Sequence, residues 1–207
     1  VAHVAFVWLR VNFGNLVRTK IVIAIHTQRL TLKKPDVVGG SADKDRIVAQ
    51  LRNWEVTKML SSVPYPYTGQ DAEAWFAMGE SQEHVLSLNI FLDEQLIGGI
   101  GLTPADESRY ELGYWLGESY WGQGFATEAA QGLLEFAAKT FNQTFVTTLD
   151  KSRVFAICYL ENPGSANVLK KLGFREVSRT QIFSQSRDCD VDAVELELSG
   201  WPQHFLK

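Results

Sequence analysis

The sequence predicts one α/β (α+β) domain in which strands and helices alternate around a single central sheet. Segments that are β-branched or alternate in hydrophobicity take turns with segments of helical spacing from about residue 21 to residue 198. A chain of 207 residues with 45% hydrophobic and 12% aromatic content has ample material for one core. Residues 21–207 are therefore expected to form a single domain, which residues 1–20 precede as an extension.

The first twenty residues do not match a secretory signal. Four apolar residues recur at helical spacing: Val4, Val7, Trp8 and Val11. Arg10 and Gly14 interrupt any signal-peptide core, and no Ala-x-Ala-like cleavage site follows them. We expect an extension packed outside the domain, or a product of start-site choice since the chain begins at Val1. A helix that contacts a partner is the alternative.

Hydrophobic periodicity and capping residues predict three helices in the N-terminal half of the domain. Ser41 or Asp43 caps the first, which ends near Arg52. Thr68 and Asp71 lie at capping-box spacing and begin the third. In chain order the expected elements are a strand over at least residues 29–33, helices to about 52, over 54–60 and over 72–80, and strands over 85–92 and 96–102 around a tight turn at 93–95.

The C-terminal half alternates between the two patterns more regularly. A strand is predicted from Tyr110 to Leu116 and a helix from Gly124 to about Thr140. Gly173 suits the C-cap of a helix over residues 165–172. The other expected elements are a short strand at 145–149 in a poorly patterned segment, a strand at 153–159, and a closing hairpin of 175–185 with 190–198.

A strand, a glycine turn and a helix start follow one another between Tyr110 and Ala130, and this order predicts an anion site. Free N–H groups of the first helical turn converge there, the helix dipole adds partial positive charge, and glycines let the backbone close on a ligand. A P-loop would need a lysine just after Gly124, and a dinucleotide fold would need one more spacer before Ala126. An ordinary turn is the alternative.

The residues around this turn resemble a known family. Trp121-Gly122-Gln123-Gly124-Phe125-Ala126 resembles the acetyl-CoA pyrophosphate loop of the GNAT superfamily of N-acetyltransferases, Gln/Arg-x-x-Gly-x-Gly/Ala, although Trp121 departs from the usual first residue. The segment 161–174 is similar to the second family landmark, Asn-x-x-Ser before a helix that ends in Lys-x-Gly-Phe. Residues 27–32 and 64–68 resemble the ribosomal-protein N-terminal acetyltransferase (RimJ/RimL-like) branch. The likeness spans roughly residues 21–199.

The resemblance implies a mixed, mostly antiparallel central sheet with helices on both faces, in which parallel strands at 110–116 and 153–159 splay apart. It also implies acetyl-CoA as co-substrate, with the pantetheine arm in the gap. The residues expected to bind it are Trp115 and Leu116 by backbone pairing, Gly122, Gln123, Gly124, Phe125, Ala126 and Thr127 at the pyrophosphate, and Asn162 and Asn167 in the second landmark. An Asx turn before Pro163 is the alternative for Asn162, and Lys170 and Lys171 are candidates for the 3′-phosphate.

The implied reaction is direct attack of an amine on the thioester. Unperturbed pKa values are roughly 10.4 for lysine and 7.7–8.0 for an α-amino group, so an α-amine needs only modest help to lose its proton. Glu111 is the expected base, because the family often carries a carboxylate on this strand; a carboxylate paired with lysine or arginine is the alternative.

The leaving thiolate needs a proton, and the usual source is missing. Many family members have a tyrosine where this chain has Leu169. Ser165 is expected to take that role, or else it is simply the N-cap of its helix. Cys158, in the middle of an apolar strand, is predicted to be core, because a cysteine nucleophile would need a nearby histidine and aspartate.

Composition excludes several other classes. A net charge of −4 and an isoelectric point near 5.6 argue against a nucleic-acid or anionic-membrane partner, and no apolar run has membrane-spanning length. Two cysteines give no disulfide framework and favour a cytoplasmic protein, and no Cys/His cluster has the spacing of zinc ligands. A metal site is therefore not expected, and the protein is expected to be a monomer or a homodimer.

Three functions compete. The first is an N-acetyltransferase whose favoured acceptor is a protein N-terminal α-amine. The second keeps the chemistry and acts on a small amine such as a polyamine, amino acid or aminoglycoside. The third is a catalytically idle acyl-CoA-binding module that regulates a partner. The acceptor pocket is expected between the helices of 54–80 and the hairpin of 181–192.

Overall fold

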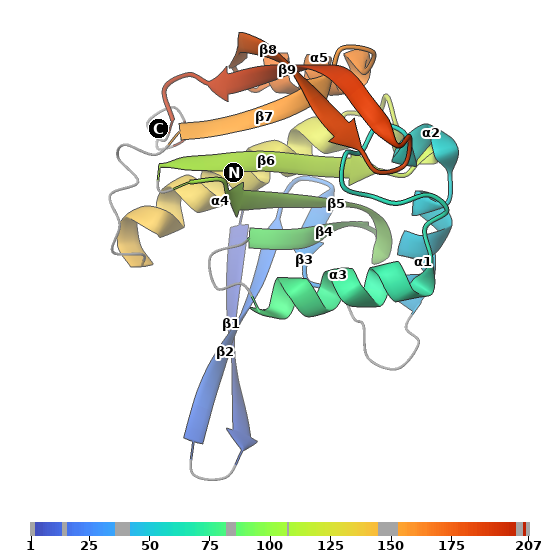
Figure 1. The fold of residues 1–207 in the computed structure, drawn as a ribbon. Helices are drawn as coiled ribbons and strands as arrows, with labels where there is room; N and C mark the ends of the chain where they lie inside the picture. The colour runs from blue at the N-terminus through green and yellow to red at the C-terminus, as the bar shows by residue number, and fades with distance from the viewer. Residues whose placement is uncertain are drawn as a thin grey trace.

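One sheet runs through the whole chain, with its strands in the order β1-β2-β3-β4-β5-β6-β7-β9-β8 (Figure 1). The computed structural model describes residues 3–13, 16–35, 42–81, 86–106, 108–144, 153–201 and 205. Neighbouring strands are antiparallel except for β6 and β7, which confirms the expected mixed, mostly antiparallel sheet. The strands are β1 His3–Phe13, β2 Leu16–His26, β3 Leu30–Lys33, β4 Leu86–Leu92, β5 Gln95–Pro104, β6 Arg109–Leu116, β7 Arg153–Tyr159, β8 Phe174–Ser184 and β9 Cys189–Leu198.

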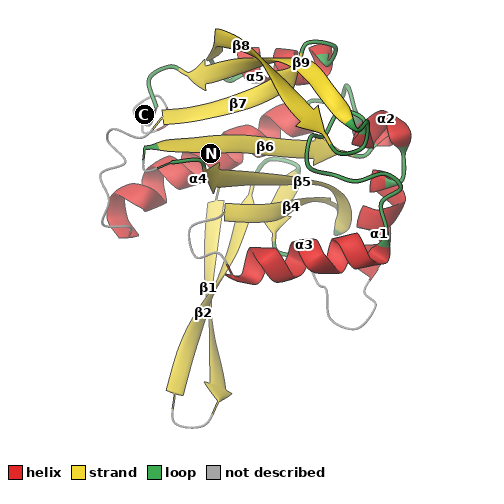
Figure 2. Cartoon of the chain, viewed as in Figure 1, coloured by secondary structure: helices red, strands yellow, loops and turns green. Residues whose placement is uncertain are grey.

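Helices cover both faces of the sheet, as Figure 2 shows. One face carries α4 and α5, whose buried Leu133 and Leu169 belong to the larger hydrophobic core. The other face carries α1, α2 and α3, where Ile47, Val56 and Ala72 form a second cluster with residues of β4 and β5. The helices are α1 Ala42–Leu51, α2 Trp54–Thr57, α3 Gly69–Ser81, α4 Phe125–Thr144 and α5 Pro163–Lys171, with a short 3₁₀ helix, η1, over Glu118–Tyr120.

Local sequence signals place most element boundaries within a few residues. The tight turn between β4 and β5 has Asp93 and Glu94 at positive φ, as a two-residue hairpin requires. The helix predicted over 165–172 begins earlier, because Asn162 caps it and Pro163 occupies its first turn. The strand predicted at 145–149 lies outside the described residues.

The N-terminal segment forms a strand rather than the helix that its apolar spacing suggested. β1 pairs with β2 along its full length, from His3 with His26 to Phe13 with Leu16. Only Ala24 to His26 of β2 also pair with β3, so the rest of this hairpin extends beyond the sheet (Figure 1). Backbone pairing can override a helical pattern, since hydrophobic spacing is a weak guide in short segments.

The first turn of α3 is closed by the predicted capping box. The Thr68 N–H donates to the Asp71 carboxylate over 2.8 Å, and the Asp71 N–H donates back to Thr68 Oγ1 over 3.3 Å. The Thr68 hydroxyl also donates to the Asp71 carboxylate, and this hydrogen bond, followed by the one from the Thr68 N–H, lowers the pKa of Asp71. The cap fixes the start of a helix that packs against α1 on the second face of the sheet.

Replacing Thr68 with alanine should lower the free energy of unfolding by about 1 kcal/mol, because the first-turn amide loses its acceptor. Thermal unfolding measures the change, and Thr68→Ser, which keeps the hydroxyl, should restore most of it. Asp71 has a depressed pKa, so its contribution exists above the unfolded pKa and is lost as the pH falls through the folded one. An Asp71→Asn variant that loses equal stability at pH 7 and at pH 2 would contradict this assignment.

Candidate active site

The sheet opens between β6 and β7. These strands pair at three positions only, Arg109 with Arg153, Tyr110 with Val154 and Glu111 with Phe155. β6 then continues along β5 to Leu116, while β7 continues along β9 to Tyr159. Beyond Glu111 the two strands face each other without ladder pairing, which is the predicted splay.

The β6 edge of this gap offers backbone groups to a ligand. The Gly117 N–H donates to the carbonyl of Ile97 on β5, so strand alternation points the backbone of Trp115 toward β5 as well. The backbone of Tyr114 and Leu116 therefore faces the gap, whereas that of Trp115, which was predicted to pair with the pantetheine arm, does not. The Leu116 carbonyl accepts from the indole Nε1 of Trp121 over 2.8 Å. The Leu116 amide and the Tyr114 groups are left for an added strand-like chain.

The glycine turn and the start of α4 follow directly. Gly122 and Gly124 have φ of 72° and 82°, a left-handed conformation that glycine adopts without strain. The hydrogen bond from the Glu128 N–H to the Gly124 carbonyl is the first of the helix, so the amides of Phe125 to Thr127 have no acceptor within it. A Cβ at Gly122 would meet nothing within 4 Å, so the turn has room for a ligand. These features fit a pyrophosphate.

An ion pair fixes this turn to the first strands of the domain. Glu128, in the first turn of α4, accepts from the Thr27 hydroxyl, the Arg29 N–H and Arg29 Nε, each over 2.7 Å. Burial alone would raise the pKa of Glu128, but these hydrogen bonds outweigh it and lower the pKa. Arg29 also donates to the Gln123 carbonyl over 3.1 Å and lies over the Phe125 ring. Sequence reasoning matched residues 27–32 to a family branch but assigned Arg29 no role.

On the face of the sheet that carries α4 and α5, four side chains lie together at the wall of the gap, those of Tyr114, Cys158, Asn162 and Ser165. Tyr114 Oη lies 2.8 Å from Ser165 Oγ and donates to the Ser165 carbonyl over 3.2 Å. Asn162 Oδ1 accepts from the Ser165 N–H over 3.0 Å, so the N-cap of α5 is Asn162 and not Ser165. Cys158 Sγ donates to the Asn162 carbonyl over 3.4 Å. The hydroxyl of Ser165 is thus held by a tyrosine instead of capping its own helix.

Tyr114 was not predicted as a functional residue. Burial raises its pKa, and so keeps the phenol protonated. Leu169, at the position where many relatives have a tyrosine, is fully buried in the larger core. The phenol that contacts the start of α5 therefore belongs to Tyr114 on β6, and not to a residue of α5. The available signal was the alternation of β6, which puts Leu112, Tyr114 and Leu116 on one face.

Glu111 lies on the opposite face of β6 from Tyr114, because the two residues are three positions apart in a strand. No hydrogen bond or ion pair to another described residue holds its carboxylate. Burial raises the pKa of Glu111, and the nearby carboxylate of Glu195 raises it further. A half-buried carboxylate without a cationic partner is typical of a functional group.

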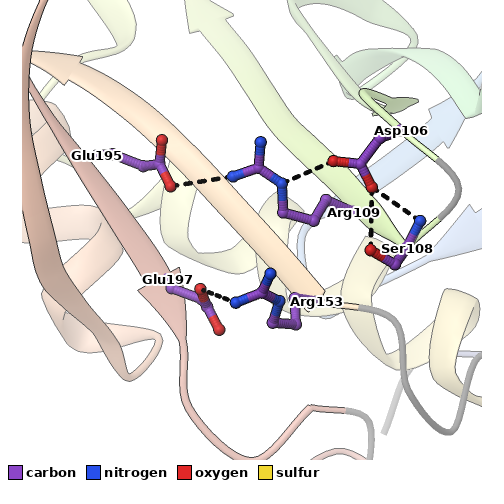
Figure 3. Close-up of polar contacts among 6 residues, drawn as sticks. All are labelled: Asp106, Ser108, Arg109, Arg153, Glu195 and Glu197. Carbon is purple, nitrogen blue, oxygen red and sulfur yellow. Dashed lines mark hydrogen bonds and ion pairs between the residues drawn. The ribbon is translucent and has the colours of Figure 1, made fainter.

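Salt bridges close the sheet beside Glu111 (Figure 3). The Arg109 guanidinium lies between two carboxylates, 2.9 Å from Asp106 and 3.3 Å from Glu195. Arg153 lies 3.4 Å from Glu197. Both arginines therefore pair with carboxylates other than that of Glu111. The contacts also hold β6, β7 and β9 together where the gap begins.

The far end of the gap on the Glu111 face is bridged by two loops. The turn between β8 and β9 reaches the segment after α2 (Figure 1). The Gln185 N–H donates to the Ser61 carbonyl and Arg187 Nε donates to the Lys58 carbonyl, each over 2.9 Å. The same arginine lies over the ring of Tyr159. The two segments expected to form the acceptor pocket therefore contact each other here.

The positions of the other predicted residues say less about function. Asn167 is exposed on α5, and Lys170 on the same helix lies 3.7 Å from Glu176. Cys158 is buried, as expected of a core residue, and burial raises the pKa of its thiol. Within the described residues, no helix is long and apolar enough to cross a membrane.

Comparisons with known proteins agree with this geometry. Residues 29–175 match the model of the acetyltransferase (GNAT) domain. The chain is 27% identical over 180 residues to the uncharacterized N-acetyltransferase p20 of Bacillus licheniformis, covering 84% of this chain and 94% of that protein.

Two solved structures share the fold. One is RimL, a ribosomal L7/L12 α-N-protein acetyltransferase in complex with coenzyme A (TM-score 0.66, 17% identity, 83% of this chain and 94% of that one). The other is a spermidine N-acetyltransferase from Vibrio cholerae with CoA and spermine (TM-score 0.63, 18% identity, 83% and 96%). At these identities the structures support the fold alone, but the domain model spans most of the chain. The protein belongs to the GNAT family of acetyltransferases.

Proposed function

We propose that this acetyl-CoA-dependent N-acetyltransferase acts on a protein N-terminal α-amine. The acetyl-CoA-dependent activity follows from the family; the acceptor is the proposal. The observation that carries it is the pair of functional groups on opposite faces of the open sheet. Among the described residues Glu111 has no cationic partner, and a carboxylate of this kind is a modest base that suits an amine already partly neutral at cellular pH.

The cofactor fits the gap between β6 and β7. When bound, acetyl-CoA supplies an activated acetyl thioester. The amides of Gln123 to Thr127 would hold the pyrophosphate at the positive end of α4, with Gly122 giving room for it. The backbone of Tyr114 and Leu116 would pair with the pantetheine arm, and Asn162 and Asn167 would line its other side. The Leu116 N–H would stabilise negative charge on the carbonyl oxygen.

Glu111 would remove the proton of the acceptor amine through a bridging water. Its carboxylate lies at the closed end of the gap, so the bridging water would connect it to an amine that enters from the open end. Burial and the Glu195 carboxylate raise the pKa of Glu111, which brings its proton affinity nearer to that of an α-amine and so favours proton transfer.

Ser165 would donate a proton to the departing thiolate on the other face. Tyr114 would position this hydroxyl, because their oxygens lie 2.8 Å apart and the phenol stays protonated. A positioned donor of this kind takes over from the tyrosine that Leu169 replaces. The mechanism needs no nucleophile from the protein, and the buried thiol of Cys158 would remain outside the chemistry.

A small amine is the second candidate acceptor. The structural neighbour with bound spermine shows that this fold can hold a polyamine. The acceptor side of this chain also carries more carboxylates than cations near the gap, including Glu111, Glu195 and Glu197. A cytoplasmic location and a monomeric or homodimeric state remain predictions, as does the absence of a nucleic-acid partner. Incubation with acetyl-CoA, a thiol reagent and a panel of peptides and amines distinguishes the acceptors.

Gly124→Asp should abolish acetyl-CoA binding, because it puts negative charge where the pyrophosphate would lie. Gly124→Ala is the matched control, since both variants strain the same left-handed backbone by about 1 kcal/mol and only one adds charge. Calorimetry should give at least tenfold weaker binding for the aspartate than for the alanine variant, with similar melting temperatures. Equal affinities would argue against a pyrophosphate at this turn.

Glu111→Gln should lower kcat/KM about 10²-fold at neutral pH, with partial rescue at high pH where the amine is already neutral. Glu195→Gln should instead move the acidic limb of the pH profile to lower pH, because it removes the repulsion that helps to raise the pKa of Glu111. An unchanged limb in the Glu195 variant would remove Glu111 as the titrating base.

The same raised pKa has a consequence for stability that needs no substrate. A carboxyl group whose folded pKa is raised supports stability below its unfolded pKa and loses that support as the pH rises through the folded value. Glu111→Gln should therefore gain melting temperature relative to the wild type at pH 7 and not at pH 4. A larger gain at pH 4 would show that burial of Glu111 has been misjudged.

Ser165→Ala should lower kcat about tenfold with little rescue at high pH, and Tyr114→Phe should lower it about threefold by leaving the serine hydroxyl unoriented. Acetyl-CoA affinity should change little in either. Tyr110→Phe makes the same deletion on the same face of β6, outside the gap, and should keep full activity. Equal activity of the Tyr114 and Tyr110 variants would deny Tyr114 a positioning role.

A further inference from the structure

A cavity of about 300 Å³ lies beside the end of β6, between the last turn of α1 and the segment that follows the strand. Its walls include Gln50, Asn53, Gly117, Glu118 and Ser119. α1 packs on the Glu111 face of the sheet, where Trp115 contacts the same cluster. The cavity therefore lies on the proposed acceptor side, next to the open end of the gap.

Gln50 gives this wall an uncompensated oxygen. Its Nε2 donates to the Leu96 carbonyl over 3.0 Å, and because a carbonyl can only accept, the amide orientation is fixed. Its Oε1 is buried and has no hydrogen-bond partner among the described residues. A Cβ at Gly117 would lie 2.9 Å from this oxygen, so glycine is needed there to let the backbone approach Gln50 closely. Its φ of −57° does not itself require glycine.

The remaining charges have the same sign. Glu118 is exposed at the cavity, and the only partner found for its carboxylate among the described residues is the amide of Asn53, 2.6 Å away. α1 ends at Leu51. Arg52 follows it, but its Nε donates to the Tyr67 carbonyl and it does not line the cavity, so the negative end of the helix dipole lies against the cavity. No lysine, arginine or histidine is among the described residues that line it. Each of these features favours a cation.

We infer that this cavity binds a second cationic group of the acceptor, while the amine that reacts lies in the gap beside it. Glu118 makes the direct contact, and the Gln50 oxygen and the α1 terminus add negative potential behind it. The acceptor class is then an amine with a further ammonium or guanidinium group, either a polyamine or an N-terminal segment with a basic residue near its amine. The inference rests on the proposed acetyl transfer and narrows its acceptor.

Binding of spermine to the full chain in the presence of CoA tests the site, since calorimetry needs no turnover. Glu118→Gln removes the charge and keeps an oxygen for Asn53, and it should weaken spermine about three- to fivefold, as expected for an exposed ion pair. Gly117→Ala, which intrudes on Gln50, should weaken it at least as much. Glu135→Gln on α4 removes the same charge from the other face of the sheet and should change nothing. The Glu118 effect should shrink in high salt.

Two peptides that differ only in lysine or norleucine at the second residue distinguish the acceptor sources. A lysine preference in kcat/KM that Glu118→Gln abolishes indicates a protein N-terminus, whereas tight spermine binding without such a preference indicates a polyamine.

Spermine that fails to bind while acetyl transfer to peptides proceeds without lysine preference would overturn the cation site and leave the proposed function intact. Loss of CoA affinity in Gly117→Ala with unchanged spermine affinity would also overturn it, because the cavity would then hold the pantetheine arm. Failure of the wild type to bind acetyl-CoA would remove both.

Discussion

The architecture depends on a backbone constraint, the loss of pairing between β6 and β7 after their third residue pair. A parallel pair inside an otherwise antiparallel sheet can separate at low cost only if other elements hold each strand. β5 holds β6 through Leu116, and β9 holds β7 through Tyr159. The salt bridges of Arg109 and Arg153 to β9 fasten the closed end. The backbone N–H and C=O groups along the unpaired strand edges are then left without partners. Because such groups need hydrogen bonds when they are buried, a ligand in the gap can supply them.

The sequence allowed most of the fold to be predicted, because its signals are local. Thr68 with Asp71, the Asp93 turn and the glycines at 122 and 124 each specify a backbone geometry from neighbouring residues. The same locality explains the errors. The strand His3–Phe13 depends on its pairing with β2. The helical spacing of its valines carries no information about that pairing. The start of α5 was predicted at residue 165 and not at Pro163, because serine and asparagine both suit the N-cap position.

The site could be predicted only where a motif runs along the chain. The glycine turn and the helix start were predicted this way, but contacts between distant segments were not. Arg29 meets Glu128 across 99 positions, and Tyr114 meets Ser165 across 51. Neither pair has a sequence signature, because the fold alone brings them together. Strand alternation did fix that Glu111 and Tyr114 face opposite sides of the sheet.

Asn162 combines a structural role with a proposed binding role. Its Oδ1 accepts from the Ser165 N–H, and its second lone pair and its NH₂ group remain for other partners. Aspartate would cap the helix equally well, but it would add a negative charge and could not donate a hydrogen bond. The two residues are therefore equivalent for the start of α5 and differ in the donor that they offer beside the gap.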